Sequence, residues 1–330
     1  MASYKELHGH NIQTVSSDPD NPIHGQIWYN TTTGTIRAFQ GTAAGTWASG
    51  GNINSDGHFQ TAGAGTQTAA LIAGGGTQWP GVHETANTET YNGSAWSEVA
   101  NLNTSRRNLS GLGTQTAALA GGGGPTAKVI VESWNGSGWT EVGDFNTNKD
   151  NNCGMCGTTT AGIAFGGEGT PGAKIANAEQ WNGSSWTEVG DLNTARMSLG
   201  AAGTSTATLG MGGSVDSPAA GDEVESYNGT SWTETTDLNT ASREGIAGWG
   251  TQTAAIGAGG STLNVEQWNG TSWTEQNNLS VAKHHMGPSQ AGTTTAGLVA
   301  GGFYGPGIQV TQATEEWTGP SDETVTFDAS

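Results

Sequence analysis

Residues 250–260 read GTQTAAIGAGG, and close copies of this stretch recur along the chain. Residues 113–123 read GTQTAALAGGG, and residues 65–75 read GTQTAALIAGG. Three looser copies bring the total to six, and the leading glycines are Gly65, Gly113, Gly157, Gly203, Gly250 and Gly292. Consecutive copies begin 42 to 48 residues apart. A period of this length indicates a protein assembled from repeated supersecondary units.

A second motif follows the first five copies. It places an acid, an aromatic residue, Asn-Gly and a tryptophan at fixed offsets, as in EQWNGSSWTEV from Glu179. Asn-Gly between β-rich flanks is the preferred two-residue hairpin turn, because both central residues accept positive φ. A third motif, Leu-Asn-Thr with a basic residue nearby, closes the unit, as from Leu192 to Arg196. Each repeat therefore predicts four antiparallel strands, and the whole predicts an all-β, six-bladed β-propeller.

The two ends of the repeat array are incomplete in complementary ways. The sixth copy is followed by Glu315-Glu316-Trp317 but by no tryptophan strand, whereas Gly45-Thr46-Trp47 matches the start of a fourth strand with no blade before it. We therefore expect the N-terminal segment to complete the last blade and close the ring, which removes an open sheet edge. Residues 24–40 predict a further hairpin. If that hairpin forms half of another blade, the ring has seven blades.

These motifs divide the chain into three parts. Residues 1–44 are expected to form an N-terminal attachment segment with a β-hairpin. Residues 45–320 are expected to form the propeller, and residues 321–330 a C-terminal tail.

Composition narrows the class of protein. Ten Lys and Arg against 29 Asp and Glu give a net charge of −19, which disfavours binding to a nucleic-acid backbone. No apolar run is long enough for a transmembrane helix, and residues 1–13 have no signal-peptide core. We therefore expect the protein to be made and folded in a cytoplasm. Two cysteines are too few for a disulfide framework.

One tryptophan recurs at the same offset in every repeat. A ring of exposed tryptophans would be a platform for sugar binding. One large side chain per blade at a fixed offset instead favours insertion between adjacent blades, where the Ala-rich strands leave room. The residues concerned are Trp47, Trp96, Trp139, Trp186, Trp232 and Trp273.

Acids and bases recur at two other offsets. Catalytic carboxylates would be unique and not present in every blade, so we interpret these residues as structural ion pairs or backbone clamps. The acids are Glu132, Glu179, Glu225 and Glu266, and the bases are Arg106 or Arg107, Arg196 and Arg243, with Lys149 and Lys283 in similar places. The sequence thus predicts no catalytic residue and no cofactor.

Two further groups of residues could in principle hold a metal. Cys153 and Cys156 have the spacing of a redox or zinc motif, but there is no second pair to complete a site. They replace apolar or small residues of the other repeats and lie three apart on a strand, so we expect buried cysteines on opposite faces. His284, His285 and His58 fall near one end of the channel. No repeated pattern supports a metal there, and none is predicted.

The loops after Gly-Gly differ in length and content between repeats, unlike the uniform turns. In propeller topology these loops share one face, and variation collecting on one face usually marks a binding face. Neutral drift in exposed loops is the alternative. The residues best able to contact a sugar or protein there are Trp79, His83, Phe303 and Tyr304.

The Gly-Gly pair, the following Glu, the Tyr or Trp, the later Trp and the Arg together resemble the kelch repeat over residues 47 to 318. The segment GQIWYN from Gly25 and the repeated GTQTAALAGGG and WNGSSWTEVGDLNTAR units resemble kelch-like virion structural proteins of tailed, especially marine, phages. That resemblance implies a non-enzymatic surface or tail-fibre component made in the host bacterial cytoplasm.

The partners that the resemblance implies are other virion proteins or a host glycan or protein, without nucleic acid or membrane insertion, and homo-oligomers are compatible with it. Two alternatives remain. One is a propeller enzyme acting on glycans, as a lyase or hydrolase. The other is a cytoplasmic kelch-type scaffold.

Overall fold

The computed structural model describes residues 12–19, 26–41, 44–55, 58–77, 83–124, 128–216, 221–304, 309–320 and 322–327. All regular structure in this part of the chain is β-strand, and it includes no helix that could cross a membrane. The chain divides into two units. The larger unit is Thr46–Gly319, and the smaller unit combines Met1–Gly45 with Pro320–Ser330.

The larger unit contains five four-stranded antiparallel sheets, each a meander of strands close together in the chain. The first sheet contains β5 (Ala62–Thr66), β6 (Ala69–Ala73), β9 (Thr88–Tyr91) and β10 (Trp96–Val99). The second contains β11 (Ser110–Thr114), β12 (Ala117–Gly121), β13 (Val131–Trp134) and β14 (Trp139–Glu141). The third contains β15 (Gly154–Thr158), β16 (Ala161–Phe165), β17 (Ala178–Trp181) and β18 (Trp186–Glu188). The fourth contains β19 (Gly200–Thr204), β20 (Ala207–Met211), β21 (Val224–Tyr227) and β22 (Trp232–Glu234). The fifth contains β23 (Ile246–Thr251), β24 (Ala254–Gly259), β25 (Val265–Trp268) and β26 (Trp273–Glu275).

The sixth sheet combines strands from both ends of the larger unit. Its order is β28-β29-β32-β4, so the N-terminal strand β4 occupies the place that β10 has in the first sheet. The pairing of β4 with β32 is antiparallel and sets Trp47 opposite Trp317. The strands are β28 (Gly287–Pro288), β29 (Ala296–Ala300), β32 (Thr314–Thr318) and β4 (Thr46–Ser49).

Two small sheets lie in the loops of the larger unit. One pairs β7 with β8, and the other has the order β27-β30-β31. The strands are β7 (Gly76–Thr77), β8 (His83–Glu84), β27 (Lys283–His284), β30 (Phe303–Tyr304) and β31 (Gln309–Val310).

The Asn-Gly motifs form the turns between the third and fourth strands. At Asn135 the side-chain Oδ1 accepts hydrogen bonds from the backbone N–H of Ser137 (2.9 Å) and Gly138 (3.0 Å). Gly136 has φ of +91°, a conformation that L side chains rarely adopt. The turn therefore brings Trp139 directly opposite Trp134, where their rings lie 5.5 Å apart.

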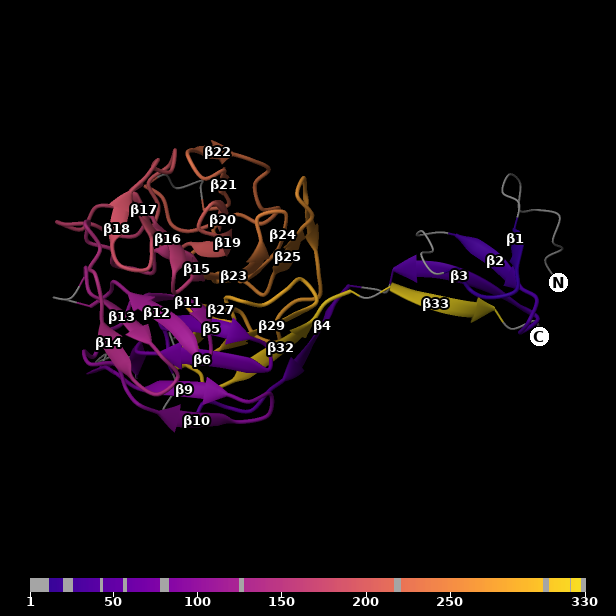
Figure 1. The fold of residues 1–330 in the computed structure, drawn as a ribbon, viewed down its shortest axis with the longest axis horizontal. Coiled ribbons are helices and arrows are strands. Elements are labelled where there is room, and N and C mark those ends of the chain that lie inside the picture. Colours follow the sequence, from indigo (N-terminus) through magenta and orange to yellow (C-terminus); the bar gives the residue numbers. More distant parts are fainter. Residues whose placement is uncertain are drawn as a thin grey trace. The chain divides into compact units, whose positions relative to one another are not determined.

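The core lies between successive sheets. Strands β5, β11, β15, β19 and β23 lie towards the centre of the larger unit, and β10, β14, β18 and β22 lie at its rim (Figure 1). Alanines of the central strands pack against large side chains of the neighbouring sheet. In one such cluster Ala62 and Leu71 of the first sheet meet Trp139 of the second. An equivalent cluster joins Leu298 of the sixth sheet to Trp96 of the first.

The smaller unit is one four-stranded sheet with the order β1-β2-β3-β33. Its strands are β1 (Gln13–Val15), β2 (Ile27–Asn30), β3 (Thr35–Gly41) and β33 (Asp322–Phe327). Trp28 of β2 is buried, and its Nε1 donates to Asp18 Oδ1 at 2.9 Å. Arg37 of β3 pairs with the same carboxylate. The hydrogen bonds from Asn30 and Trp28, and then the charge of Arg37, hold the pKa of Asp18 below its usual range.

Several sequence predictions can be compared with this architecture. The all-β fold made of four-stranded antiparallel sheets is confirmed, and it is consistent with a propeller-like fold. The predicted hairpin is present as β2 and β3, but it belongs to the separate smaller sheet. Residues 321–330 were expected to form a tail, whereas Asp322–Phe327 forms strand β33 on β3. The backbone polar groups of this segment form hydrogen bonds with a strand more than 280 positions away. No local sequence motif indicates this pairing.

Candidate functional site: the channel mouth and its loops

The repeated acids and bases form buried clamps. Arg106 Nη2 lies 2.9 Å from Glu132 Oε1, and both side chains are almost completely inaccessible. The same Arg106 donates to the carbonyl oxygens of Gly122 (2.7 Å) and Ile130 (2.9 Å). Glu132 Oε2 in turn accepts from the backbone N–H of Asn103, at 2.7 Å. The clamp thus fastens the connection from the first sheet to the third strand of the second.

The clamp recurs with small changes around the larger unit. Burial lowers the pKa of Arg243 to about 10, with Glu266 opposing the shift, so this guanidinium remains charged at neutral pH. Arg107, the other candidate base of its repeat, lies partly exposed, 3.5 Å from Glu84. The equivalent buried pairs are Lys149–Glu179 (3.7 Å), Arg196–Glu225 (3.0 Å), Arg243–Glu266 (2.6 Å) and Lys283–Glu315 (2.5 Å).

Among the described residues, the clamp between the sixth and first sheets contains a histidine where the other clamps contain arginine or lysine. Glu89 is buried and accepts hydrogen bonds from the backbone N–H of Asn54 (2.8 Å) and Ser55 (3.1 Å). Ser55 Oγ also bonds to Glu89 and lies 2.7 Å from Nε2 of the buried His58. Burial lowers the pKa of His58, and the nearby Glu89 opposes this shift. His58 therefore occupies the position of Arg106 without its charge.

The repeated tryptophans lie between sheets. Trp139 Nε1 donates to Thr88 Oγ1 of the preceding sheet at 3.0 Å, and Trp96 Nε1 donates to Thr314 Oγ1 of the sixth sheet at 2.9 Å. Trp47 is partly exposed and packs its ring 5.3 Å from that of Trp317. The other members, each 3 to 7% exposed, are Trp96, Trp139, Trp186, Trp232 and Trp273.

The two cysteines are buried and unpaired. Cys153 belongs to the cluster between the second and third sheets, and Cys156 to the cluster between the third and fourth, so they lie on opposite faces. Burial raises the pKa of the Cys153 thiol to about 11 and that of Cys156 to about 12. Both are protonated at neutral pH, and the thiol is a poor nucleophile and ligand.

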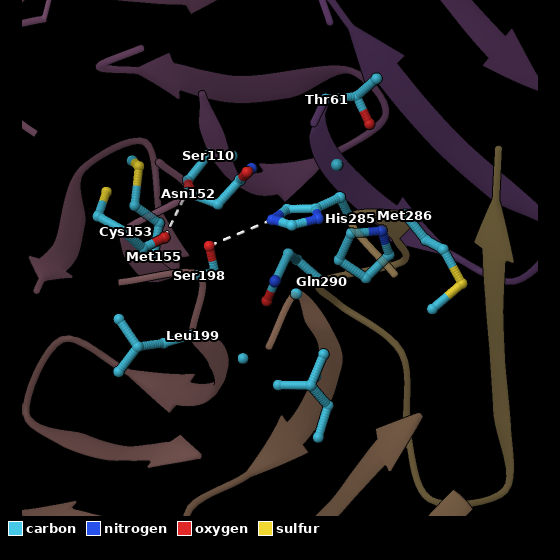
Figure 2. A pocket seen from close by; sticks show the side chains of 17 residues that line it. Thr61, Ser110, Asn152, Cys153, Met155, Ser198, Leu199, His285, Met286 and Gln290 are labelled. Atoms are coloured by element: carbon cyan, nitrogen blue, oxygen red, sulfur yellow. Dashed lines mark hydrogen bonds between the residues drawn. The ribbon is translucent and has the colours of Figure 1, made fainter. Parts of the chain in front are cut away.

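A cavity of about 40 Å³ lies where the first strands of the sheets begin. The wall of the cavity contains residues from all six sheets, either from a first strand or from the segment that leads into it. Among the described residues its polar lining consists of neutral side chains, and glycines and apolar side chains complete it (Figure 2). The polar residues are Thr61, Ser110, Asn152, Ser198, His285 and Gln290.

A ring of left-handed residues surrounds this cavity. Each lies just before the first strand of its sheet, and their φ values run from +51° to +68°. Only one is glycine, although a non-glycine residue with positive φ is uncommon. The ring consists of Gln60, Asn108, Asn152, Ser198, Gly245 and His285. We call these six residues the left-handed ring.

Backbone hydrogen bonds connect the left-handed ring from sheet to sheet. The N–H of Gln60 donates to His285 O at 2.8 Å, which joins the first sheet to the sixth. The N–H of Gly245 donates to Ser198 O at 2.9 Å. Further links run from His285 to Gly245 (2.8 Å), from Ser198 to Asn151 (2.8 Å) and from Asn152 to Asn108 (3.0 Å). The wall of the cavity is therefore held by main-chain contacts.

Ser198 and His285 form a hydroxyl–imidazole pair that the sequence analysis did not single out. Ser198 Oγ lies 3.2 Å from His285 Nε2 (Figure 2). His285 Nδ1 lies 2.8 Å from His284 Nδ1. Burial, and then His284, lowers the pKa of His285 to about 3. A general base works best with a pKa near the operating pH. This imidazole is neutral and only weakly basic, so the pair suits hydrogen bonding better than activation of a nucleophile.

The histidines do not assemble into a metal centre. His58 belongs to the clamp at Glu89, whereas His284 and His285 contact each other and the ring of Phe303. Within the part of the chain that the structure describes, no group of three or more His, Cys, Asp or Glu side chains could hold a metal ion.

The predicted ligand-binding residues have different surroundings. His83 is exposed on β8, and Tyr304 of β30 is partly exposed beside a shallow surface depression. Phe303 is buried, with its ring 3.9 Å from that of Phe59. Phe59 also bridges to Gly76 of β7, so the loops that carry His83 and Tyr304 both contact it. Trp79 lies outside the described residues.

The variable loops border the cavity mouth. Isolated bridges join the segment before a first strand to the loop after the second strand of the same sheet, as in Asp150 with Glu168 and Met197 with Ser214. Lys128 of the second sheet's loop contacts Asp150 at 3.0 Å. The left-handed ring and the variable loops therefore share one face of the larger unit.

Comparison of the chain with protein-family models and with curated proteins gave no match.

Proposed function

We propose that the chain is a non-enzymatic structural and binding protein of a phage particle. A six-bladed, kelch-like propeller, closed by its N-terminal segment, presents the variable loops to a host receptor, to a glycan or to another virion protein. The observation that carries this proposal is the arrangement of the larger unit: its repeated acids and bases are held in clamps, whereas its variable loops surround one cavity mouth.

One pairing within the sixth sheet and two contacts between the sixth and first sheets support closure of the ring. Strand β4 fills the outer position of the sixth sheet. Leu298 and Trp96 share a core cluster across the two sheets. The N–H of Gln60 donates to His285 O. A closed ring of four-stranded sheets leaves only short, protected edges, which limits edge-to-edge aggregation of a repetitive β protein.

The character of the cavity favours binding over catalysis. A glycan lyase or hydrolase would need convergent, unrepeated carboxylates in the channel. The described lining consists of neutral polar side chains, apolar side chains and glycines. The repeated glutamates that could have served as acids are engaged with arginine, lysine and backbone N–H groups.

The smaller unit supports a role in attachment. Strand β3 precedes the larger unit in the chain and β33 follows it, yet the two pair over six residues. Both chain connections to the larger unit therefore end in one sheet. Such an anchor would hold the propeller by two strands, which suits a component mounted on a particle.

Mass spectrometry and imaging of purified virions test the proposal. We expect peptides of this chain in the purified particle, at a position on its surface. A chain found in infected cells but missing from purified particles would instead indicate the cytoplasmic scaffold. Hydrolysis or elimination of a glycan by the purified protein would indicate the propeller enzyme.

A further inference from the structure

Buried side-chain oxygens without a hydrogen-bond partner gather at the cavity and the left-handed ring, which together we call the channel mouth. Within the described part of the chain, three such atoms belong to residues that line the cavity: Thr61 Oγ1, Asn152 Oδ1 and Gln290 Oε1. Two more, Gln60 Oε1 and Asn108 Oδ1, belong to the left-handed ring. Thr61 is only 4% exposed. These five oxygens come from the first, second, third and sixth sheets.

The direction of one of these oxygens is fixed by its own side chain. Asn152 Nδ2 donates to Leu109 O at 2.9 Å. Turning the amide over would place its oxygen against that carbonyl, so Oδ1 must be the atom that remains without a protein donor. Figure 2 shows Thr61, Asn152 and Gln290 on different sides of His285.

Unpartnered acceptors are costly to bury, at about 1–3 kcal/mol each. They are satisfied by a group that donates hydrogen bonds or by a cation that accepts their lone pairs. Two hydroxyl donors of the cavity wall are already engaged, since Ser110 Oγ donates to Cys153 O at 2.5 Å and Ser198 Oγ contacts Asn151 O and His285. The guest that suits this mouth therefore brings donors or positive charge.

The charge of the protein and the size of the cavity limit which ligand can bind there. The net charge of −19 attracts cations to the protein. Divalent ions usually need carboxylate ligands, which the described lining does not supply, whereas hydroxyl and amide oxygens suit a weakly hydrated monovalent ion. A cavity of about 40 Å³ accommodates one or two groups of the size of water. Because the imidazole of His285 is neutral, it does not repel a cation bound in the cavity.

We propose that the channel mouth binds a small monovalent cation of the size of potassium or ammonium, either free or as the ammonium end of a longer amine such as a lysine side chain. Thr61, Asn152 and Gln290 supply the acceptor oxygens. The variable loops border this site, but the binding of a cation here does not depend on the proposed function of those loops.

Thermal unfolding of the full chain at constant ionic strength tests the site. Potassium chloride and ammonium chloride should each raise the Tm in a saturable way, by several degrees at about 100 times Kd, relative to tetramethylammonium chloride. Tetramethylammonium carries the same charge but is too large and has no N–H group. Equal Tm values in the three salts would overturn the proposal.

Paired variants assign the effect to the cavity. Thr61→Val combined with Gln290→Met removes two acceptor oxygens that have no protein partner, so folding should persist and the shift should disappear. Gln267→Met is the matched control, because Gln267 Oε1 is also buried and unpartnered but lies on β25, away from the cavity lining. A shift that survives in the double variant would refute the assignment.

A second measurement needs no variant. Crystals of the wild-type chain grown with thallous acetate should give an anomalous peak beside Thr61, Asn152 and Gln290, and a cavity without this peak would contradict the proposal.

A comparison with butylammonium chloride distinguishes the two sources of the cation. Stabilisation equal to that by ammonium indicates the end of a longer amine, whereas stabilisation by potassium and ammonium alone indicates a free ion.

Discussion

Trp47 and Trp317 lie opposite each other in antiparallel strands, with ring centroids 5.3 Å apart, although the two residues stand near opposite ends of the larger unit. In the same pairing Thr46 stands opposite Thr318, and both side chains are exposed. The contact between β4 and β32 is therefore the point at which the first and last strands of the larger unit meet.

A cross-link at this point should stabilise the larger unit. Thr46→Cys combined with Thr318→Cys should form a disulfide under oxidising conditions and raise the free energy of unfolding by about 2–4 kcal/mol. The gain should vanish on reduction. Thr46→Cys combined with Thr204→Cys, on the unrelated strand β19, is the control and should stay reduced. Failure of the first pair to cross-link would argue against closure by β4.

Adjacent arginines should differ sharply in their contribution to stability. Arg106→Ala leaves Glu132 buried without its cation, which should cost about 3–5 kcal/mol of unfolding free energy. Arg107→Ala removes only a partly exposed contact with Glu84 and should cost about 0–1 kcal/mol. Denaturant unfolding followed by tryptophan fluorescence measures both. Similar losses for the two variants would contradict the clamp interpretation.

Buried histidines should make the larger unit less stable in mild acid. The pKa of His285 is lowered to about 3 from 6.5, so the unfolded chain takes up a proton below pH 6.5 that the folded chain refuses. Its contribution to stability is thus complete above pH 6.5 and falls as the pH drops towards 3, by up to about 1.4 kcal/mol per pH unit. The pKa values of His58 and His284 are lowered too and act in the same direction.

His285→Asn isolates this contribution. Asparagine already occupies the left-handed ring at Asn108 and Asn152, so the backbone conformation should persist. Denaturant unfolding between pH 6.5 and 4.5 should show a slope shallower than that of the wild type by up to one proton. An unchanged slope would mean that His285 is not the buried neutral group described above.

Binding through the loop face should depend on the aromatic residues that the sequence predicts for it. Tyr304→Ala and Trp79→Ala should each weaken binding to a glycan array by about tenfold or more, since stacked aromatic rings dominate such contacts. Tyr29→Ala, an exposed tyrosine of the smaller unit, is the control and should bind as the wild type does. Unchanged binding by the Tyr304 and Trp79 variants would remove the loop face from the hypothesis.

The repeat pattern predicts most of the sheets, because hairpin turns and alternating burial are encoded locally. Copies of Gly-Thr-x-Thr and Asn-Gly mark the turns, and the unmatched Trp47 indicates the strand that completes the sixth sheet. Strand β33 could not be found in this way, because its partner β3 lies almost the whole chain away. The choice between Arg106 and Arg107 also required the structure, since burial alone distinguishes them.

The channel mouth was only partly predictable. His285 was noticed as a histidine near the channel, but its role in the left-handed ring was not. A signal did exist, because Gln60, Asn108, Asn152 and Ser198 each lie five residues before a leading glycine of the repeat. His285 departs from that spacing by two residues. Which oxygens remain without partners depends on contacts between sheets, and these are absent from any single repeat.

The left-handed ring has a consequence for how this channel can vary. Its backbone admits few amino acids without strain: glycine, asparagine and, at some cost, other residues such as serine and histidine. Valine, isoleucine and threonine, whose branched Cβ clashes with this conformation, are the residues it admits least readily. The backbone of the larger unit therefore limits the side chains that can stand at these six positions, while those side chains still differ in hydrogen-bonding capacity from one sheet to the next.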